Sequence, residues 1–118
     1  MDLKQEGFFR ELPYGDPDGD SLQQAVGKPS DCDIEKIVSY LSAGHILAVA
    51  PGLSRDVLSK ERDVIGSLSV MTDGTYAWPN DLIYYLRKYN VRISDDFRAH
   101  MQQANWTVPP VDVQTINF

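Results

Sequence analysis

The sequence predicts a single α+β domain in which a small antiparallel sheet with a β-hairpin packs against about three helices. Its length of 118 residues suits one domain, and its hydrophobic content of 42% is enough for one core. Apolar residues recur at helical spacing in two regions, and between them Asp73-Gly74 separates two runs with strand character. We expect residues 1–30 to form an irregular acidic segment and residues 31–118 to form the α+β body.

The first 30 residues are rich in turn formers, which predicts irregular structure with one short helical turn near residues 21–25. Phe8, Phe9 and Leu12 lie close together in this segment. Because three large apolar side chains so close in sequence are seldom all left in water, we expect them to anchor the segment to the body.

The next region predicts a helix over residues 32–43, where apolar side chains recur at i, i+3, i+4 and i+7. Asp31 and Asp33 suit its N-terminus, because a helix start favours capping oxygens and negative charge. Gly44 suits its C-terminal end.

The short apolar run 46–50 predicts a buried strand that ends at Pro51-Gly52. Residues 53–66 are polar and charged, and they predict a surface connection.

The β-hairpin is expected over residues 68–78, with Asp73-Gly74 as a two-residue turn, since both central positions of such a turn need positive φ. In that register Met71 faces Tyr76, and Thr72 faces Thr75. Side-chain alternation then defines two faces: Leu68, Val70 and Ala77 on one, and Met71, Tyr76 and Trp78 on the other.

Two further helices are expected after the hairpin. Pro79 suits the first turn of a helix over about residues 80–89. Another begins at Ser94, where acidic residues complement the helix dipole. The side chains expected to face inward are Leu82, Tyr85, Leu86 and Tyr89 in the first helix, and Phe97, Met101 and Ala104 in the second.

The net charge of −6 is placed unevenly along the chain. Residues 1–35 contain nine acidic and three basic residues, whereas residues 36–118 contain eight of each. An acidic surface repels nucleic acid and anionic membranes and favours a basic protein partner. The expected partner-binding carboxylates are Asp16, Asp18, Asp20, Asp31 and Asp33. The alternative interpretation is a solvated face that keeps the protein soluble.

Aromatic residues are dense between positions 76 and 89. Tyr and Trp are enriched at binding hot spots, but they also build ordinary cores. Tyr76, Trp78 and Tyr84 are therefore candidates for a partner-binding patch, with a role in the core as the alternative. Tyr84 is the strongest candidate, because it points away from the apolar stripe of its predicted helix.

No local motif indicates catalysis, a metal site or a cofactor. The run Asp16–Asp20 resembles the start of a calcium loop, but Gly27 occupies the position where that loop needs a bidentate acid. Cys32 is the only cysteine, which excludes an internal disulfide and a four-cysteine zinc site. The two histidines, His45 and His100, lack the spacing of a helical metal site.

The predicted localisation is cytoplasmic. The first residues are acidic where a signal peptide would be basic, and no apolar run approaches the ~20 residues that a membrane span needs.

Residues 72–86 contain an Asp-Gly turn, a Trp78-Pro79 step and a Tyr84-Tyr85 helix. Together with similar stretches at residues 40–44 and 89–101, they resemble a group of small uncharacterised bacterial proteins. These proteins are similar in style to the immunity proteins of bacterial toxin systems. The resemblance covers roughly the last two-thirds of the chain, and it implies binding to a toxin rather than catalysis.

Two functional hypotheses follow. In the first, the chain is a non-catalytic immunity protein that binds and neutralises a cognate basic toxin domain through its acidic segment and an aromatic patch. In the second, it is an enzyme or small-molecule-binding protein with a pocket between the hairpin and the helices, using Asp73, Asp81 or His100.

Overall fold

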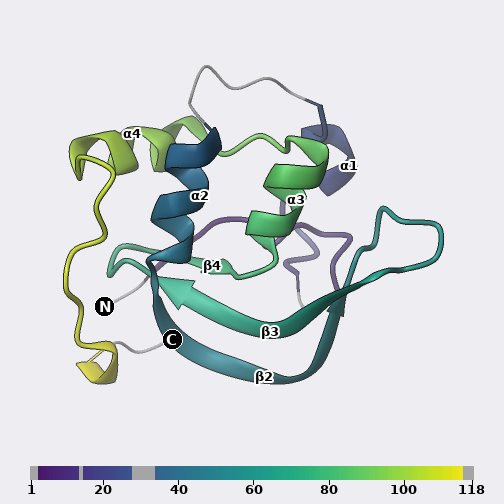
Figure 1. The fold of residues 1–118 in the computed structure, drawn as a ribbon, viewed down its shortest axis with the longest axis horizontal. Helices are drawn as coiled ribbons and strands as arrows, with labels where there is room; N and C mark the ends of the chain where they lie inside the picture. The colour runs from purple at the N-terminus through teal and green to yellow at the C-terminus, as the bar shows by residue number, and fades with distance from the viewer. Residues whose placement is uncertain (1–2, 14, 28–33, 116–118) are drawn as a thin grey trace.

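A computed structural model describes residues 3–13, 15–27 and 34–115 (Figure 1). This part of the chain forms one four-stranded sheet and four α-helices, which confirms the α+β class. The elements in chain order are β1 (Lys4–Gln5), α1 (Leu22–Ala25), α2 (Ile34–Ser42), β2 (His45–Arg55), β3 (Val64–Thr72), β4 (Tyr76–Pro79), α3 (Leu82–Tyr89), α4 (Asp95–Gln103) and the 3-10 helix η1 (Val113–Thr115).

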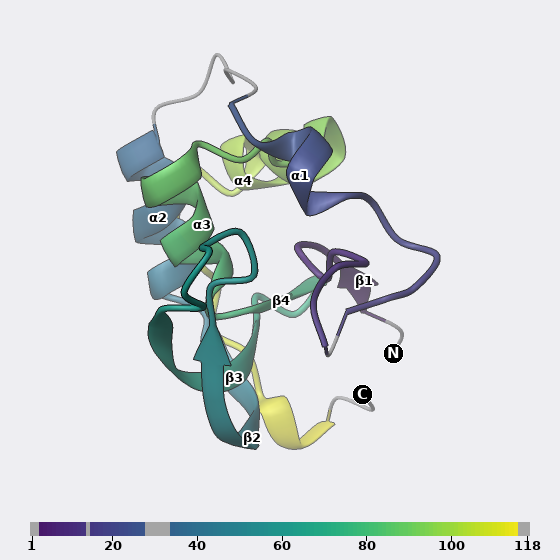
Figure 2. The same ribbon diagram turned by 90° about the vertical axis from the view of Figure 1, so that its right-hand side faces the viewer.

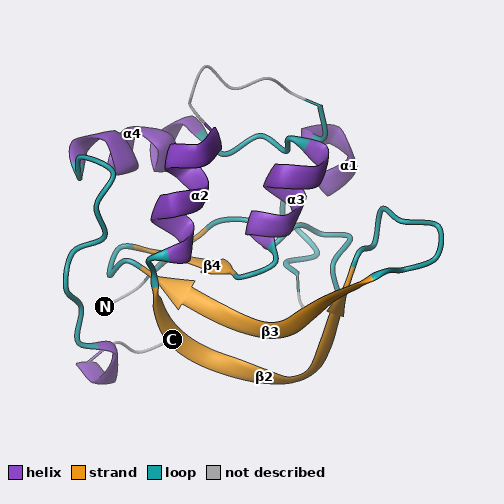
Figure 3. Ribbon diagram, viewed as in Figure 1, coloured by secondary structure: helices purple, strands orange, loops and turns teal. Residues whose placement is uncertain are grey.

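The sheet is mixed rather than purely antiparallel, so that part of the prediction is wrong. Its strand order is β1-β4-β3-β2, and β1 pairs with β4 in parallel. Figure 3 shows β3 between β4 and β2. The N–H of Lys4 donates to the carbonyl of Thr75, and the N–H of Glu6 donates to that of Ala77, both at 2.9 Å. A strand of two residues leaves no alternation in the sequence, which is why it was not expected.

β2 extends well beyond the predicted end at Pro51-Gly52, and residues 53–66 are not simply a surface connection. The pairing with β3 shifts between Val49 and Leu53, so that extra residues of β2 form a bulge around Pro51. Gly52 has a φ of 89°, which a glycine adopts at little cost. β2 is also an edge strand, where a proline without an N–H is tolerated.

β3 and β4 pair antiparallel, but the predicted register is wrong by two residues: Met71 lies opposite Trp78, and Thr72 lies opposite Ala77. The cause is the Asp73 carboxylate, whose Oδ1 accepts the N–H groups of Thr75 at 2.9 Å and Tyr76 at 2.7 Å. This places Gly74 and Thr75 at the centre of the turn. A shift of two residues preserves the faces, so Met71, Tyr76 and Trp78 still share one side of the sheet, and Tyr76 and Trp78 contact the helices there.

The helices α2, α3 and α4 lie on the same side of the sheet (Figures 1 and 2). Their positions agree with the predicted apolar stripes, and Ser94 caps α4 by accepting the N–H of Phe97 at 3.2 Å. Asn90 ends α3 in the left-handed conformation. Asp31 and Asp33, which were predicted both to cap α2 and to bind a partner, lie outside the described residues.

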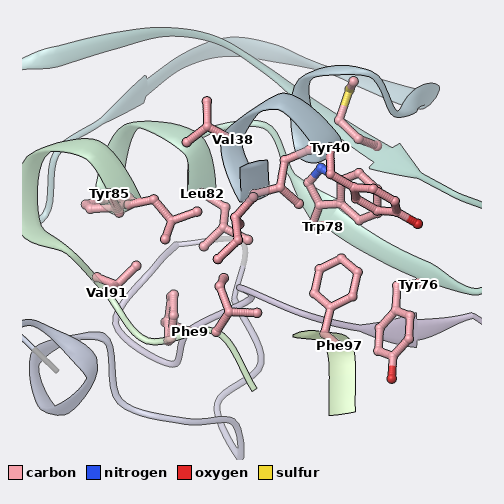
Figure 4. Close-up of a cluster of buried hydrophobic side chains, with 14 of the residues drawn as sticks. Phe9, Val38, Tyr40, Tyr76, Trp78, Leu82, Tyr85, Val91 and Phe97 are labelled. Atoms are coloured by element: carbon pink, nitrogen blue, oxygen red, sulfur yellow. The ribbon is translucent and has the colours of Figure 1, made fainter. Parts of the chain in front are cut away.

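Aromatic side chains dominate the part of the core between the sheet and the helices (Figure 4). Phe97 of α4 lies with its ring centroid 5.4 Å from that of Trp78, and it stacks on Tyr76 at 4.4 Å. Tyr40 of α2 contacts both Trp78 and Phe97. Phe9 and Leu12 are buried as expected and join the N-terminal segment to this core.

Candidate functional site

The acidic loop, residues 15–20, presents Asp16, Asp18 and Asp20, and all three side chains are exposed. Its backbone is held at both ends: the N–H of Asp16 donates to the carbonyl of Phe8 at 3.1 Å, and the N–H of Arg10 donates to that of Asp20 at 3.0 Å. The Oδ1 of Asp16 also accepts the N–H of Asp18. The three carboxylates are therefore displayed from a well-supported loop.

Glu11 fixes the chain immediately after this loop. Its carboxylate accepts hydrogen bonds from the hydroxyl of Ser21 and from the N–H groups of Leu22 and Gln23, at 2.8–2.9 Å. Burial of the Glu11 carboxyl raises its pKa, but these hydrogen bonds outweigh that effect and the pKa is lowered overall. Glu11 is thus a charged clamp between the start of the loop and α1.

A cavity of about 450 Å³ opens beside the acidic loop. It lies between the N-terminal segment, α1, the start of α3 and the residues that precede α4. The lining residues that carry charge are Glu6, Asp16, Asp20 and Arg92, and Phe8, Phe9 and Leu82 contribute apolar wall. A second and more open hollow of about 660 Å³ lies between β3 and α3, where Arg87 and Lys88 line it.

Glu6 is the most buried of the three carboxylates that line the first cavity. It follows β1, and its Oε2 accepts the N–H of Ser94 at 3.1 Å, which joins the N-terminal segment to the start of α4. Burial raises the pKa of Glu6, and the negative charges of Asp20 and Asp96 raise it further. This arrangement is suited to binding a cation, because a positive charge in the cavity would offset both effects.

Of the aromatic candidates, Tyr76 and Trp78 belong to the core. They are 5% and 0% exposed, so neither is available to a partner in this structure, and the core alternative holds for both. Their side chains occupy the helix-covered face of the sheet because alternation places them there with Met71. Tyr84 is partly exposed, and its hydroxyl donates to Oδ2 of Asp56 at 2.8 Å.

Asp73 and His100, which the second hypothesis singled out, do come together. Nε2 of His100 lies 3.0 Å from Oδ2 of Asp73, and the buried Tyr40 hydroxyl donates to the same oxygen at 2.5 Å. Burial and the Asp73 carboxylate both raise the pKa of Tyr40. Because the second oxygen of Asp73 already binds the turn, this carboxylate is fully engaged in joining α2, α4 and the β3–β4 turn.

Asp81 is separate from that pair and is almost fully buried, at 1% exposure. Its Oδ2 accepts the Ser54 hydroxyl at 2.6 Å, whereas Oδ1 has no hydrogen-bond partner among the described residues. Burial raises the pKa of Asp81 to about 7. Neither hollow described above is lined by Asp73, Asp81 or His100.

Sequence reasoning missed a network around Asp56, whose side chain is fully buried. Oδ2 of Asp56 accepts hydroxyls from Tyr84 and Tyr89, and Oδ1 accepts the N–H groups of Leu58 and Ser59. Lys88 lies 3.6 Å from the carboxylate and over both tyrosine rings. The local signal for this site is the Asx turn that begins at Asp56; its tyrosine partners are distant in sequence.

Among the residues that the structure describes, no group of three or more His, Cys, Asp or Glu side chains could hold a metal ion. The described helices also include none that is long and apolar enough to cross a membrane.

Comparison of the chain with protein families, with curated proteins and with solved structures finds no match in any of the three.

Proposed function

We propose that this protein is a non-catalytic binding module that binds a basic protein partner through the acidic loop. The resemblance noted in the sequence suggests the more specific role of an immunity protein that neutralises a toxin domain, which it would exercise in the cytoplasm. The observation that carries the proposal is the display of three exposed carboxylates from a loop whose two ends are hydrogen-bonded to Phe8 and Arg10 of the N-terminal segment.

Electrostatics supports a basic partner. Residues 1–35 contribute the entire net charge of −6, since the remaining acidic and basic residues balance. A surface of one sign accelerates encounter with an oppositely charged partner and repels nucleic acid. Holding the carboxylates on an ordered loop also lowers the entropy lost when a partner binds.

The state of the buried carboxylates supports a structural role for them rather than catalysis. Asp56 and Asp73 each bind two backbone N–H groups of their own turn and two side chains from other elements of the fold. A group acting as a general acid or base needs access to a substrate proton, and these oxygens face the fold instead.

A small-molecule-binding role is the second candidate, and the cavity beside the acidic loop favours it. A volume of about 450 Å³ falls in the range of ligand sites, and its wall combines apolar and charged groups. In that case affinity would depend on Glu6 and would be nearly independent of Asp18, which does not line the cavity.

The test begins with partners retained from the native host at low and moderate salt, followed by purification of a retained basic protein. Surface plasmon resonance then compares the parent with the triple variant Asp16→Asn, Asp18→Asn, Asp20→Asn. We expect association to slow by about tenfold at low salt and its salt dependence to flatten, because steering charges act chiefly on the association rate. Circular dichroism should show unchanged folding.

A matched pair of single variants controls for net charge. Asp18→Asn removes one exposed carboxylate within the acidic loop, and Glu61→Gln removes one on the loop between β2 and β3. The proposal requires a larger effect from the first. Equal association rates for the parent and the triple variant at low salt would mean that the acidic loop only keeps the protein soluble and does not guide a partner. An immunity role further requires that co-production of this chain protects cells from the retained partner.

A further inference from the structure

We infer that the cavity beside the acidic loop receives an arginine side chain of the basic partner. The identity of this occupant rests on the proposed function, but the chemistry of the cavity can be tested without the partner. The inference combines the cavity itself, the charges that line it and its aromatic wall.

The charge balance of the lining favours a cation. Three carboxylates line the cavity, from Glu6, Asp16 and Asp20, against the single guanidinium of Arg92. Arg92 is already paired, since its Nη2 lies 3.2 Å from Oδ2 of Asp95 on α4. Asp95 also binds Arg98 at 2.6 Å, so the charge of Arg92 is only partly compensated, but three carboxylates against one guanidinium still leave the lining with an excess of negative charge.

Glu6 gives the cavity a fixed acceptor rather than a mobile one. The Ser94 N–H holds its Oε2, so the carboxylate is oriented before any ligand enters. Burial and the neighbouring Asp20 and Asp96 raise the pKa of Glu6 and so disfavour its charged form. A cation held against the Glu6 carboxylate favours the charged form and opposes both effects, which makes the interaction stronger than a contact between exposed charges.

The apolar wall selects a guanidinium group over an ammonium group. Phe8, which is partly exposed, supplies the accessible aromatic ring of the lining next to Leu82, whereas Phe9 is almost fully buried. A planar guanidinium is weakly hydrated, stacks on aromatic faces and binds carboxylates through two parallel hydrogen bonds, whereas an ammonium is strongly hydrated. Arginine is also among the residues that most often anchor protein interfaces.

The test uses N-acetyl-arginine-N-methylamide as the probe, added to the full chain and followed by two-dimensional amide NMR. The lysine and citrulline analogues serve as the ammonium and neutral controls. We expect the arginine probe to shift the amides of Gly7, Gly19 and Ser94 while leaving those of β2 unchanged. The lysine analogue should bind at least about threefold more weakly, and the citrulline analogue should not bind.

Two variants of the cavity lining and one control variant test whether the probe binds in the cavity. Glu6→Gln keeps an acceptor for the Ser94 N–H but removes the charge, and it should raise the Kd for the probe by about fivefold or more. Asp20→Asn should act in the same direction and involves an exposed side chain, so it does not depend on how Glu6→Gln folds. Asp18→Asn is the matched control: it lies in the same loop but outside the cavity lining, and it should change the Kd by less than about twofold.

Absence of probe binding, or equal binding to the parent and to both cavity variants, would overturn the inference. Equal binding of the arginine and lysine analogues would overturn the preference for guanidinium. These outcomes are separable from failure of the proposed function, which is decided by the association rate of the triple variant with a purified partner. If the probe binds in the cavity but the partner associates equally fast with the parent and the triple variant, the cavity is a guanidinium-binding site and the acidic loop is not the partner-binding surface.

Discussion

Two buried aspartates, Asp56 and Asp81, have pKa values that are shifted in opposite directions. Asp56 is fully buried, but two tyrosine hydroxyls and two backbone N–H groups satisfy it, and its pKa is lowered despite the opposing effect of burial. Asp81 is also inaccessible to solvent, but Oδ2 receives the Ser54 hydroxyl while Oδ1 has no hydrogen-bond partner among the described residues, and burial raises its pKa to about 7. The hydrogen-bond donors around Asp56 and the ammonium of Lys88 lower the pKa of Asp56, whereas burial dominates at Asp81.

The raised pKa of Asp81 makes a prediction about stability and pH. The folded protein holds a proton on Asp81 up to about pH 7, whereas the unfolded chain releases it near pH 4. Between these values the native state binds more protons, so the free energy of unfolding falls as pH rises. We expect the parent to lose roughly 2–3 kcal/mol more than Asp81→Asn between pH 5 and pH 8.

Urea denaturation of both proteins at the two pH values measures this difference. Comparing the parent with the variant cancels the contributions of other carboxyls, such as Glu6, whose pKa is also raised, and Asp56, whose pKa is lowered. Identical pH profiles for the parent and Asp81→Asn would mean that Asp81 is ionised in the folded state.

The Tyr40–Asp73 hydrogen bond gives a second prediction at the residue scale. Tyr40→Phe removes a buried donor from Oδ2 of Asp73 at no cost in volume, leaving His100 as its remaining side-chain partner. We expect a loss of about 1–3 kcal/mol in the free energy of unfolding, because the charged acceptor is left under-satisfied. The variant Tyr84→Phe is the control and should cost less, because Oδ2 of Asp56 keeps the Tyr89 hydroxyl and the nearby ammonium of Lys88. Equal losses would show that the Asp73 site is no more demanding than the Asp56 site.

At the scale of elements, the β3–β4 turn depends on one glycine. Gly74 has a φ of 95°, which confirms the expected positive value, and a Cβ there would lie 3.1 Å from Cγ2 of Val111. Gly74→Ala should therefore lower the free energy of unfolding by about 1 kcal/mol or more. Thermal melts of Gly74→Ala in the parent and in a Val111→Ala background separate the two causes. Backbone strain predicts the same loss in both, whereas a clash predicts a smaller loss in the second. An unchanged melting midpoint in the parent would contradict both.

The elements that could be predicted from the sequence are those whose signal is local. α2, α3 and α4 each carry an apolar stripe within a single stretch of chain, and the structure places each stripe inward. β1 could not be predicted, because its two residues pair with β4 more than 70 positions away. The full length of β2 could not be predicted, because Pro51-Gly52 normally ends a strand. The sequence does not reveal that β2 lies at the edge of the sheet, where a bulge can accommodate these two residues.

For the candidate site too, the features with a local signal in the sequence could be predicted and those formed by distant residues could not. The acidic character of residues 16–20 is visible in composition, and their exposure agrees with it. The cavity beside them was not predictable, because Glu6, Asp20 and Ser94 meet only after β1 has docked on β4. For Tyr76 and Trp78, aromatic density alone did not separate core from interface, and burial settles them as core.

At the scale of the whole molecule, charge and apolar surface are segregated. The acidic loop lies in the N-terminal segment, whereas the large exposed apolar side chains of the described residues belong to β2 and β3: Ile46, Val49, Leu53 and Val64. β2 is the outer strand of the sheet, and η1 contacts only part of it. A long edge strand with exposed apolar side chains is a template for pairing with other chains. The same molecule thus combines a charged face suited to a partner with an edge prone to self-association.

This segregation predicts that a lysine at position 49 will suppress aggregation. Val49 is 70% exposed on the edge strand, so Val49→Lys should cost little stability while placing a charge where edge pairing would bury it. The control is Ser39→Lys on the exposed side of α2, which makes the same change in net charge, from −6 to −5, away from the edge. Moving the net charge toward zero favours association in general, so the control should aggregate slightly more than the parent. Light scattering during heating should show a later onset for Val49→Lys than for the parent and an unchanged or earlier onset for Ser39→Lys. If the two variants aggregate alike, net charge rather than the β2 edge governs the behaviour of the protein at high concentration.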